Sequence, residues 1–415
     1  MATLTISAGI VDSLIANPNS VTGYSSTNNI VIIGDITHTQ ASALKAVASP
    51  SITATVSQTS AANLAAIQVD SSRTNAFTFT VNDLSAPATT LNTIKALTSV
   101  APNFGTVANI TSSTLADVKS LYTGTNASLG NEAVVISDTS VNATDLNIVN
   151  VANNAGTINI NAASTITGPA AEIDSAMSSG RITDPADIDV TVTDTGTIAA
   201  AALVNINGAT TGTVTVTTGS AITGTFANVD SVLTANAANP VGGDTITGLN
   251  ATNVTLTGAA SFSVGNVNTI ATQTTGIVTA TVTAGNIATL LGLTETGHAL
   301  TITCTTAALT ASQIALLDAK TTLPLTLAAA TSISGNYAEI LAAYNAAGSG
   351  TDLGNEAITV SDSITVAQAN ILDGKTSGTI TATISDNSMA LLDQLNTNTN
   401  DAGAVLQHAY TVNIT

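Results

Sequence analysis

A short pattern of residues repeats along this chain, and its clearest copy runs from Ile364 to Asp386. Thr365 and Gln368 have the spacing of a capping box, in which both side chains satisfy free N–H groups at the start of a helix. Gly378 marks a turn, and the residues Ile380–Ile384 then alternate apolar side chains with threonine, as a half-buried strand does. The pattern therefore predicts a short helix, a turn and one strand.

The same pattern recurs in other parts of the chain. The capping-box spacing returns at Thr37 and Thr310, each three residues before a glutamine, and the ten residues Leu129–Asp138 closely match Leu353–Asp362. Strands with the same alternation are predicted at Ile52–Val56, Phe77–Val81, Val190–Thr193, Val214–Thr217, Val278–Val282 and Leu300–Cys304. We count about fifteen repeats of about 20–32 residues, a period typical of solenoids, in which each repeat buries its apolar face against its neighbours.

We therefore predict a repeat solenoid, of the α/β or β-solenoid class, with a parallel β-sheet and short helices or loops opposite it. No linker or charge block divides residues 1–415, so the prediction is a single continuous solenoid. Its predicted parts are an N-terminal strand unit at 1–35, repeats at 36–165, repeats richer in Gly and Thr at 166–260, and regular repeats at 261–415. At 166–260 we expect the helices to weaken and the repeats to be more β-like.

Composition and charge exclude several classes of function. The chain is 44% hydrophobic but only 2% aromatic and 8% charged, which suits narrow repeats filled by small aliphatic side chains. Its net charge is −19, with seven basic residues, so it has no basic patch for nucleic acid. No apolar run is long enough for a transmembrane helix, and a single cysteine excludes an intramolecular disulfide framework.

The predicted strands at the two ends indicate how copies of the chain could join. The sequence begins with a strand around Thr3 and finishes with a strand from Tyr410 onward, and neither carries an obvious polar cap. An uncapped solenoid end exposes unpaired backbone groups and favours head-to-tail stacking. The residues predicted to make this contact are Thr3, Leu4, Ile6, Tyr410, Val412 and Ile414.

Patterns that carry chemistry are scarce. Gly348–Gly354 resembles a phosphate-binding loop, but it follows a predicted helix and precedes a strand, which is the reverse of the order that such a loop needs. His38, His298 and His408 have no second ligand three or four residues away, so we expect them at the surface or rim. Cys304 falls on the apolar side of its strand and is predicted to be a core residue. The prediction is that the protein is not an enzyme.

The acidic residues leave two interpretations open. They gather near strand ends, where carboxylates and backbone carbonyls can together supply the oxygen ligands of calcium. The same positions also suit helix N-caps and solvated strand ends. The candidate calcium ligands are Asp184, Asp187, Asp189, Asp194, Glu132, Asp138, Glu356 and Asp362.

The repeats, with the pattern LLDxKT followed by TxGxITATxxD, resemble those of large secreted surface proteins of cyanobacteria and other aquatic bacteria. Such proteins are described as haemolysin-like or adhesin-like, or as parts of surface layers. The resemblance implies an extracellular or cell-surface location, a structural or adhesive role, and calcium binding.

The predicted function is that of a secreted structural subunit which assembles head to tail with itself into a filament or surface layer. The main alternative is a monomeric adhesin or ligand-binding solenoid, whose side face binds calcium or a cell-surface glycan. An ice-binding face built from the Thr-x-Thr strands and a polysaccharide-active enzyme are further alternatives.

Overall fold

The computed structural model describes residues 2–123, 128–217, 219–237, 246–346, 352–396 and 408–412. These residues form two compact bodies. The N-terminal body contains the chain up to Asp194 and residues 205–217, and the C-terminal body contains residues 195–204, 219–237 and the chain from Ile246 onward. Helix α8 (Ala200–Ala209) contributes residues to both.

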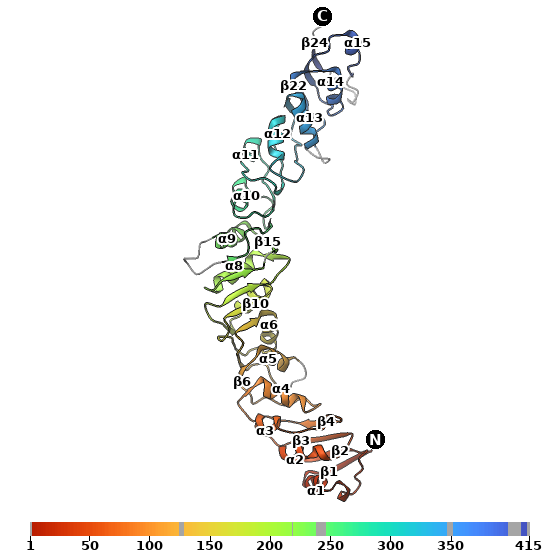
Figure 1. The fold of residues 1–415 in the computed structure, drawn as a ribbon, viewed down its shortest axis with the longest axis vertical. Helices are drawn as coiled ribbons and strands as arrows, with labels where there is room; N and C mark the ends of the chain where they lie inside the picture. The colour runs from red at the N-terminus through yellow and green to blue at the C-terminus, as the bar shows by residue number, and fades with distance from the viewer. Residues whose placement is uncertain are drawn as a thin grey trace. The chain divides into compact units, whose positions relative to one another are not determined.

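In the N-terminal body, short strands alternate with short helices (Figure 1). The strands are β1 (Thr3–Ser7), β2 (Asn29–Ile36), β3 (Ser51–Val56), β4 (Thr74–Thr78), β5 (Ser85–Pro87), β6 (Asn109–Ser113), β7 (Ala133–Ile136), β8 (Ser140–Asn142), β9 (Ile158–Asn159), β10 (Thr165–Gly168), β11 (Ile182–Thr183), β12 (Asp189–Val192) and β14 (Val214–Val216). The helices are α1 (Val11–Ala16), α2 (His38–Ala43), α3 (Ala61–Ala65), α4 (Ala88–Ala96), α5 (Leu115–Tyr122), α6 (Ala143–Ala152) and α7 (Ala170–Met177), with 3₁₀ turns η1 (Ala8–Ile10), η2 (Pro18–Ser20) and η3 (Leu44–Ala46).

The C-terminal body is built in the same way. Its strands are β13 (Thr197–Ala199), β15 (Ala221–Gly224), β16 (Ile246–Thr247), β17 (Val254–Leu256), β18 (Val278–Thr281), β19 (Ala299–Thr301), β20 (Ala308–Thr310), β21 (Ser332–Gly335), β22 (Ala357–Ile364), β23 (Ile380–Ile384) and β24 (Ala409–Val412). Its helices are α9 (Phe226–Ala237), α10 (Val264–Ala271), α11 (Ile287–Leu290), α12 (Ala311–Asp318), α13 (Tyr337–Ala346), α14 (Val366–Asp373) and α15 (Met389–Leu392).

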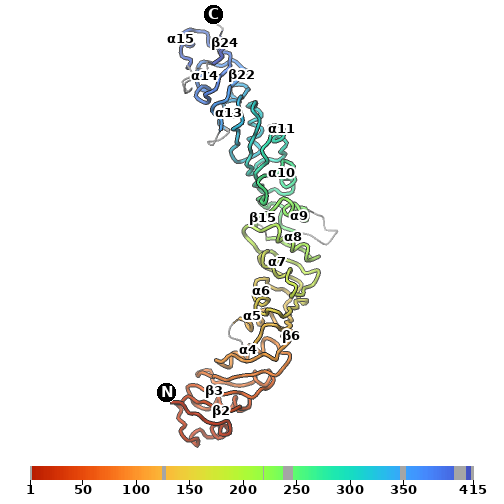
Figure 2. The backbone as a smooth tube through the Cα atoms, turned by 180° about the vertical axis from the view of Figure 1, so that it is seen from behind, coloured from red at the N-terminus to blue at the C-terminus, as the bar shows by residue number. Residues whose placement is uncertain are grey.

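The strands pair in parallel, as predicted, but the described residues form five sheets and not the single long sheet that was expected. The N-terminal body has sheets in the order β1-β2-β3-β4, β5-β6-β7-β9-β11 and β8-β10-β12-β14, and the C-terminal body has β13-β15-β17-β18-β19 and β20-β21-β22-β23-β24. Paired strands are usually separated in the chain by one helix. For example, Thr165 lies beside Asp189, which is 24 residues further along. This advance is 20 residues between β18 and β19 and 32 between β15 and β17. Figure 2 follows these consecutive strand–helix segments through each body from behind.

The core of each body consists mainly of aliphatic side chains that lie above one another on paired strands, with Phe77, Phe79 and Phe104 also fully buried in the N-terminal body. Ile30 and Ile52 are neighbours on β2 and β3, Ile358 and Ile380 are neighbours on β22 and β23, and all four are fully buried. Threonine takes the outward positions between them, as the alternation predicted. The short helices bury one face: on α14 that face includes Val366, Ala369 and Leu372.

The predicted capping boxes are present. Thr37, Thr310 and Thr365 each accept a hydrogen bond from the backbone N–H three residues later, and the glutamine at that position accepts one from the threonine N–H. Because both partners lie within one helical turn, local sequence is sufficient to specify this contact.

A second recurring feature, which we call the threonine turn, joins several of the helices to the next strand. Thr376 donates its hydroxyl hydrogen to the carbonyl of Glu356 at 2.7 Å, and it accepts the N–H of Gly378 at 3.0 Å. Gly378 has no room for a side chain, because a Cβ atom would lie 2.3 Å from the Glu356 carbonyl oxygen. The same arrangement is found at Thr210 with Gly212 and at Thr274 with Gly276.

Two sequence predictions about the elements are wrong. The stretch 166–260 was expected to have weak helices, yet it contains α7, α8 and α9, of eight, ten and twelve residues. Burial of Leu203 and Ile206 on α8 outweighs the low helix propensity of its Asn and Gly residues. The strand predicted at Phe77–Val81 is displaced, since β4 ends at Thr78 and Val81 makes only an isolated bridge to Thr59.

Candidate functional site

The duplicated ten-residue motif places two glutamates inside the protein rather than at its surface. Glu132 and Glu356, both predicted as calcium ligands, are 1% and 0% exposed. The N–H of Gly354 donates to both carboxylate oxygens of Glu356, at 2.8 and 2.9 Å, and the Tyr344 hydroxyl donates to it at 2.9 Å. These donors satisfy the buried carboxylate with hydrogen bonds.

The first copy of the motif has the same arrangement. The N–H of Gly130 and the hydroxyl of Tyr122 donate to the Glu132 carboxylate, and Asn153 binds the Glu132 backbone through both its amide oxygen and its amide nitrogen. Burial, reinforced by the adjacent carboxylate, raises the pKa of the Tyr122 and Tyr344 phenols well above the usual range. Sequence reasoning missed both tyrosines, although each precedes its glutamate by a similar interval, ten or twelve residues.

Several of the other acidic residues accept hydrogen bonds from the first N–H group of a helix in the preceding segment. Asp138 accepts the N–H of Leu115 at 2.6 Å, and Asp194 accepts that of Ala170 at 2.7 Å. Among the described residues, such contacts are Asp83 to Ala61, Asp138 to Leu115, Asp194 to Ala170, Asp362 to Tyr337 and Asp386 to Val366. A carboxylate at a helix N-terminus satisfies a free donor and complements the helix dipole.

The remaining calcium candidates lie close together in sequence. Asp189 accepts the N–H of Thr213 at 2.8 Å, Asp187 is exposed, and Asp184 is half-buried, which raises the pKa of its carboxyl. In the described ranges, no three His, Cys, Asp or Glu side chains converge as a metal site. Calcium binding stays a prediction.

We expect Asp138→Ala to lower the free energy of unfolding by about 1 kcal/mol, because the N–H of Leu115 loses its acceptor. Asp138→Asn should lose less, since the amide oxygen can still accept. Urea unfolding in calcium and in chelator measures both, with the exposed Asp187→Ala as the control. If Asp138 holds calcium instead, calcium will stabilise the native protein and fail to stabilise the alanine variant.

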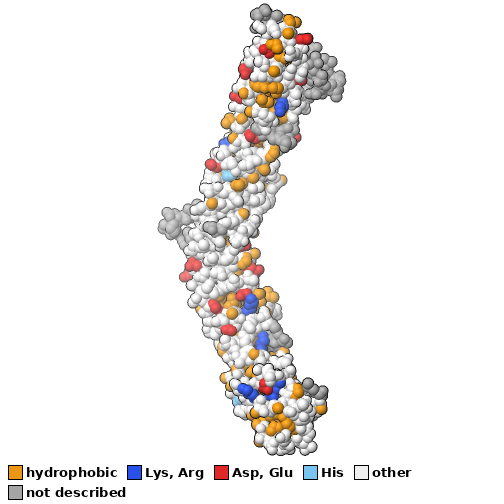
Figure 3. All heavy atoms as spheres, turned by 45° about the vertical axis from the view of Figure 1, so that its right-hand side comes forward, with side chains coloured by type: hydrophobic (Ala, Val, Ile, Leu, Met, Phe, Trp, Pro, Cys, Tyr) orange, Lys and Arg blue, Asp and Glu red, His pale blue; other side chains and the backbone are white. Residues whose placement is uncertain are grey.

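The few basic side chains are mostly engaged with backbone. Arg73 donates to the carbonyls of Leu44 and Val47, and Lys95 donates to those of Ser120 and Leu121. Arg181 and Lys320 make similar contacts with carbonyls of a preceding segment, and Lys119 pairs with Asp145. In the view of Figure 3, charged side chains are scattered over a surface that consists mostly of backbone and of side chains that are neither charged nor hydrophobic.

Two of the three histidines have buried side chains, which corrects the expectation that they lie at the surface or rim. His298 is 7% exposed and accepts the N–H of Val278 at Nδ1, at 3.2 Å. The His408 side chain is 4% exposed and accepts the N–H of Ile380 at Nδ1, at 3.0 Å. In both rings, Nδ1 accepts a hydrogen bond from the first N–H group of a strand. This bond offsets the cost of burying a polar nitrogen. Cys304 is buried in the core, as predicted.

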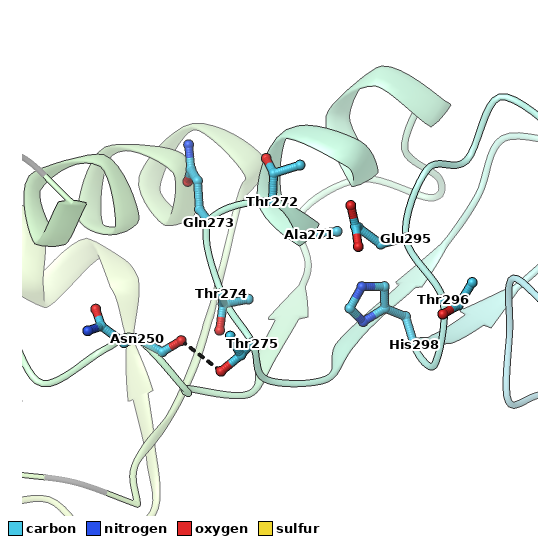
Figure 4. Close-up of a pocket in the computed structure, with 9 residues that line it drawn as sticks. All are labelled: Asn250, Ala271, Thr272, Gln273, Thr274, Thr275, Glu295, Thr296 and His298. Carbon is cyan, nitrogen blue, oxygen red and sulfur yellow. Dashed lines mark hydrogen bonds between the residues drawn. The ribbon is translucent and has the colours of Figure 1, made fainter.

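A hollow of about 520 Å³ lies beside His298 in the C-terminal body (Figure 4). It is lined by Asn250, Ala271, Thr272, Gln273, Thr274, Thr275, Glu295, Thr296 and His298. The Thr274 hydroxyl is already used in a threonine turn, and the Thr275 hydroxyl donates to the Asn250 carbonyl at 3.2 Å. Sequence reasoning did not single out this place, since its lining comes from three separate segments.

The predicted assembly residues lie on two edge strands. Thr3, Leu4 and Ile6 are on β1, and Tyr410 and Val412 are on β24, each strand being last in its sheet. Ile414 lies outside the described residues, as does the first part of the glycine-rich stretch at 348–354.

No protein-family model matches this sequence, and a search of curated proteins found no match. Within the part of the chain that the structure describes, no helix is both long and apolar enough to cross a bilayer.

Proposed function

We propose that the chain is a structural solenoid subunit that joins end to end with further copies of itself. The observation that carries this proposal is the pair of open sheet edges at β1 and β24. In the described residues, β1 pairs only with β2 and β24 pairs only with β23. Since all neighbouring strands are parallel, β24 of one copy can pair with β1 of the next in the geometry already used inside each body.

The side chains of the two edges are compatible with this pairing. Leu4 and Ile6 on β1 pair with inward-facing residues of β2. Tyr410 and Val412 on β24 likewise pair with inward-facing residues of β23. A continued register would place Tyr410 beside Leu4 and Val412 beside Ile6. The apolar alternation would thus run unbroken across the junction.

Exposed apolar side chains on the helix side support the same contact. Helix α15 has no buried residue, and its Met389 and Leu391 are 67% and 42% exposed. At the other end of the chain, Ile10 beside α1 is 41% exposed. Covering these side chains by a second copy would remove apolar surface from water, which favours association.

The proposed setting is extracellular, as a filament or surface layer without catalytic activity. The composition supports this setting, because only 8% of the residues are charged and the basic side chains are largely engaged with backbone. A net charge of −19 opposes association, so assembly should increase as salt screens the repulsion.

Val412→Lys is expected to abolish assembly, because it places a buried, unpaired charge at the junction. Analytical ultracentrifugation and negative-stain electron microscopy should show long assemblies for the native chain and single chains for the variant. Adding the variant to native protein should shorten the assemblies in proportion to its amount, since only one of its two ends is blocked.

Leu316→Lys is the matched control, because Leu316 is 55% exposed on α12, which follows β20 at the opposite end of the sheet from β24. It should assemble as the native chain does. Single native chains at every salt concentration, or loss of assembly in the control as well, would overturn the proposal. Repeating the experiment in chelator tests whether calcium contributes to the junction.

A further inference from the structure

His298 and His408 occupy equivalent positions in two segments of the C-terminal body. The segments align through their threonine turns, Thr274 with Gly276 in one and Thr376 with Gly378 in the other. The strand residue two positions after each glycine donates its N–H to a histidine Nδ1. Because Nδ1 accepts in both rings, the proton of each neutral imidazole is on Nε2.

The two histidines differ in what faces Nε2. His408 Nε2 lies 2.9 Å from Oδ1 of Asp373, which is 4% exposed. Asp373 stands three residues before the threonine of its turn, and the residue at that place in the other segment is Ala271. His298 Nε2 is consequently buried without a hydrogen-bond partner among the described side chains. One segment thus lacks the carboxylate that the other uses.

The hollow beside His298 is where this carboxylate is missing, because both Ala271 and His298 line it. Figure 4 shows the Ala271 side chain and the His298 ring on the same side of the hollow, with Glu295 next to them. A buried donor, His298 Nε2, is therefore unsatisfied beside the hollow, which is costly unless a ligand completes it.

We propose that this hollow binds an uncharged ligand rich in hydroxyl groups, such as a sugar residue of a glycan. A hydroxyl group can accept from His298 Nε2 and donate to the Glu295 carboxylate, which an anion or a cation alone cannot do. No Lys or Arg lines the hollow, and Glu295 would repel an anion. Burial lowers the pKa of His298, against the opposing effect of Glu295, so the neutral donor form prevails at neutral pH.

The test uses nuclear magnetic resonance of the imidazole nitrogens. The chain has three histidines, so the spectrum resolves His38, His298 and His408 individually. The full chain is titrated with methyl glycosides of glucose, galactose, mannose and xylose, and separately with sodium acetate. If the native chain assembles, Val412→Lys keeps the hollow intact and is used in its place, which also keeps this test independent of assembly.

The expected result is a saturable shift of the His298 Nε2 signal with at least one glycoside, while His408 does not change. Ala271→Asp should give His298 a signal like that of His408 and weaken glycoside binding by about tenfold or more, because the carboxylate then occupies the acceptor position. Ala271→Leu, which fills the hollow with an apolar side chain, should also weaken glycoside binding. In this variant the His298 signal should not become like that of His408.

A His298 shift with acetate but with no glycoside would overturn the assignment to hydroxyl-rich ligands. No His298 shift with any glycoside, or equal binding by the native chain and Ala271→Asp, would overturn the site itself. Neither result bears on the edge strands, so the assembly proposal is judged separately.

Discussion

Gly276→Ala is expected to lower the free energy of unfolding by about 3 kcal/mol, at the upper end of what an overpacked core costs. A Cβ atom at this position would lie 2.2 Å from the carbonyl oxygen of Thr252 and 2.4 Å from its carbonyl carbon. These are backbone atoms of the neighbouring segment, held in place by the Thr274 hydroxyl, and they cannot rotate away as a side chain can. Relief therefore requires a shift of the whole strand pair.

Urea unfolding, followed by circular dichroism, measures this loss. The control is Gly208→Ala on α8, where a Cβ atom has nothing within 4 Å. That substitution should stabilise the protein by about 0.5–1 kcal/mol, the usual gain for alanine over glycine in a helix. A Gly276→Ala variant as stable as the native chain would contradict the close approach. The same approach occurs at Gly156, Gly212 and Gly378, where a Cβ atom would lie 2.2, 2.4 and 2.3 Å from a carbonyl oxygen.

Glu356→Ala is expected to cost about 3 kcal/mol as well, because it leaves two part-buried donors without their acceptor and empties a fully buried site. The side chain is fully buried, and its carboxylate accepts from the Gly354 N–H and the Tyr344 hydroxyl. Truncation removes both hydrogen bonds to a charged group and opens a cavity. Tyr344→Phe should cost less, about 1.5 kcal/mol, since only one of these bonds is lost.

A double-mutant cycle separates the contributions. The loss of stability for the double variant Tyr344→Phe, Glu356→Ala should be smaller than the sum of the two single losses. In Glu356→Ala the Tyr344 hydroxyl is left without an acceptor, and in the double variant that hydroxyl is no longer present. Asp187→Ala is the matched control, as Asp187 is an exposed carboxylate, and it should change stability by less than about 0.5 kcal/mol. Equal stability of Glu356→Ala and Asp187→Ala would show that the buried carboxylate contributes nothing.

Sequence alone predicted the features whose partners are close in the chain. The capping box of Thr365 and Gln368 and the strand Ile380–Ile384 could be read directly, because periodicity and side-chain reach are local. The parallel sheets also followed from the repeating strands. The family resemblance, the function and the extracellular location were not tested and stay proposals.

Contacts between segments could not be predicted from the sequence. A carboxylate that binds a backbone N–H from another segment, as Asp194 does, has the same sequence signature as a calcium ligand. The burial of His298 and His408 was missed because it depends on a strand N–H twenty or more residues away. The missing carboxylate at Ala271 is recognised only when this segment is aligned with the segment that contains Asp373. Nothing about an alanine in the sequence indicates that another segment has an aspartate at the same place.

The direction of the aspartate contacts has a consequence for how the chain folds during synthesis. Each of these helices receives its N-terminal acceptor from a carboxylate that lies 20 to 25 residues further toward the C-terminus. On the ribosome, the most recently translated of these helices therefore remains incomplete until the following strand emerges, while all earlier ones are finished. Folding that advances in step with translation would leave only a single segment at risk of misfolding at any moment.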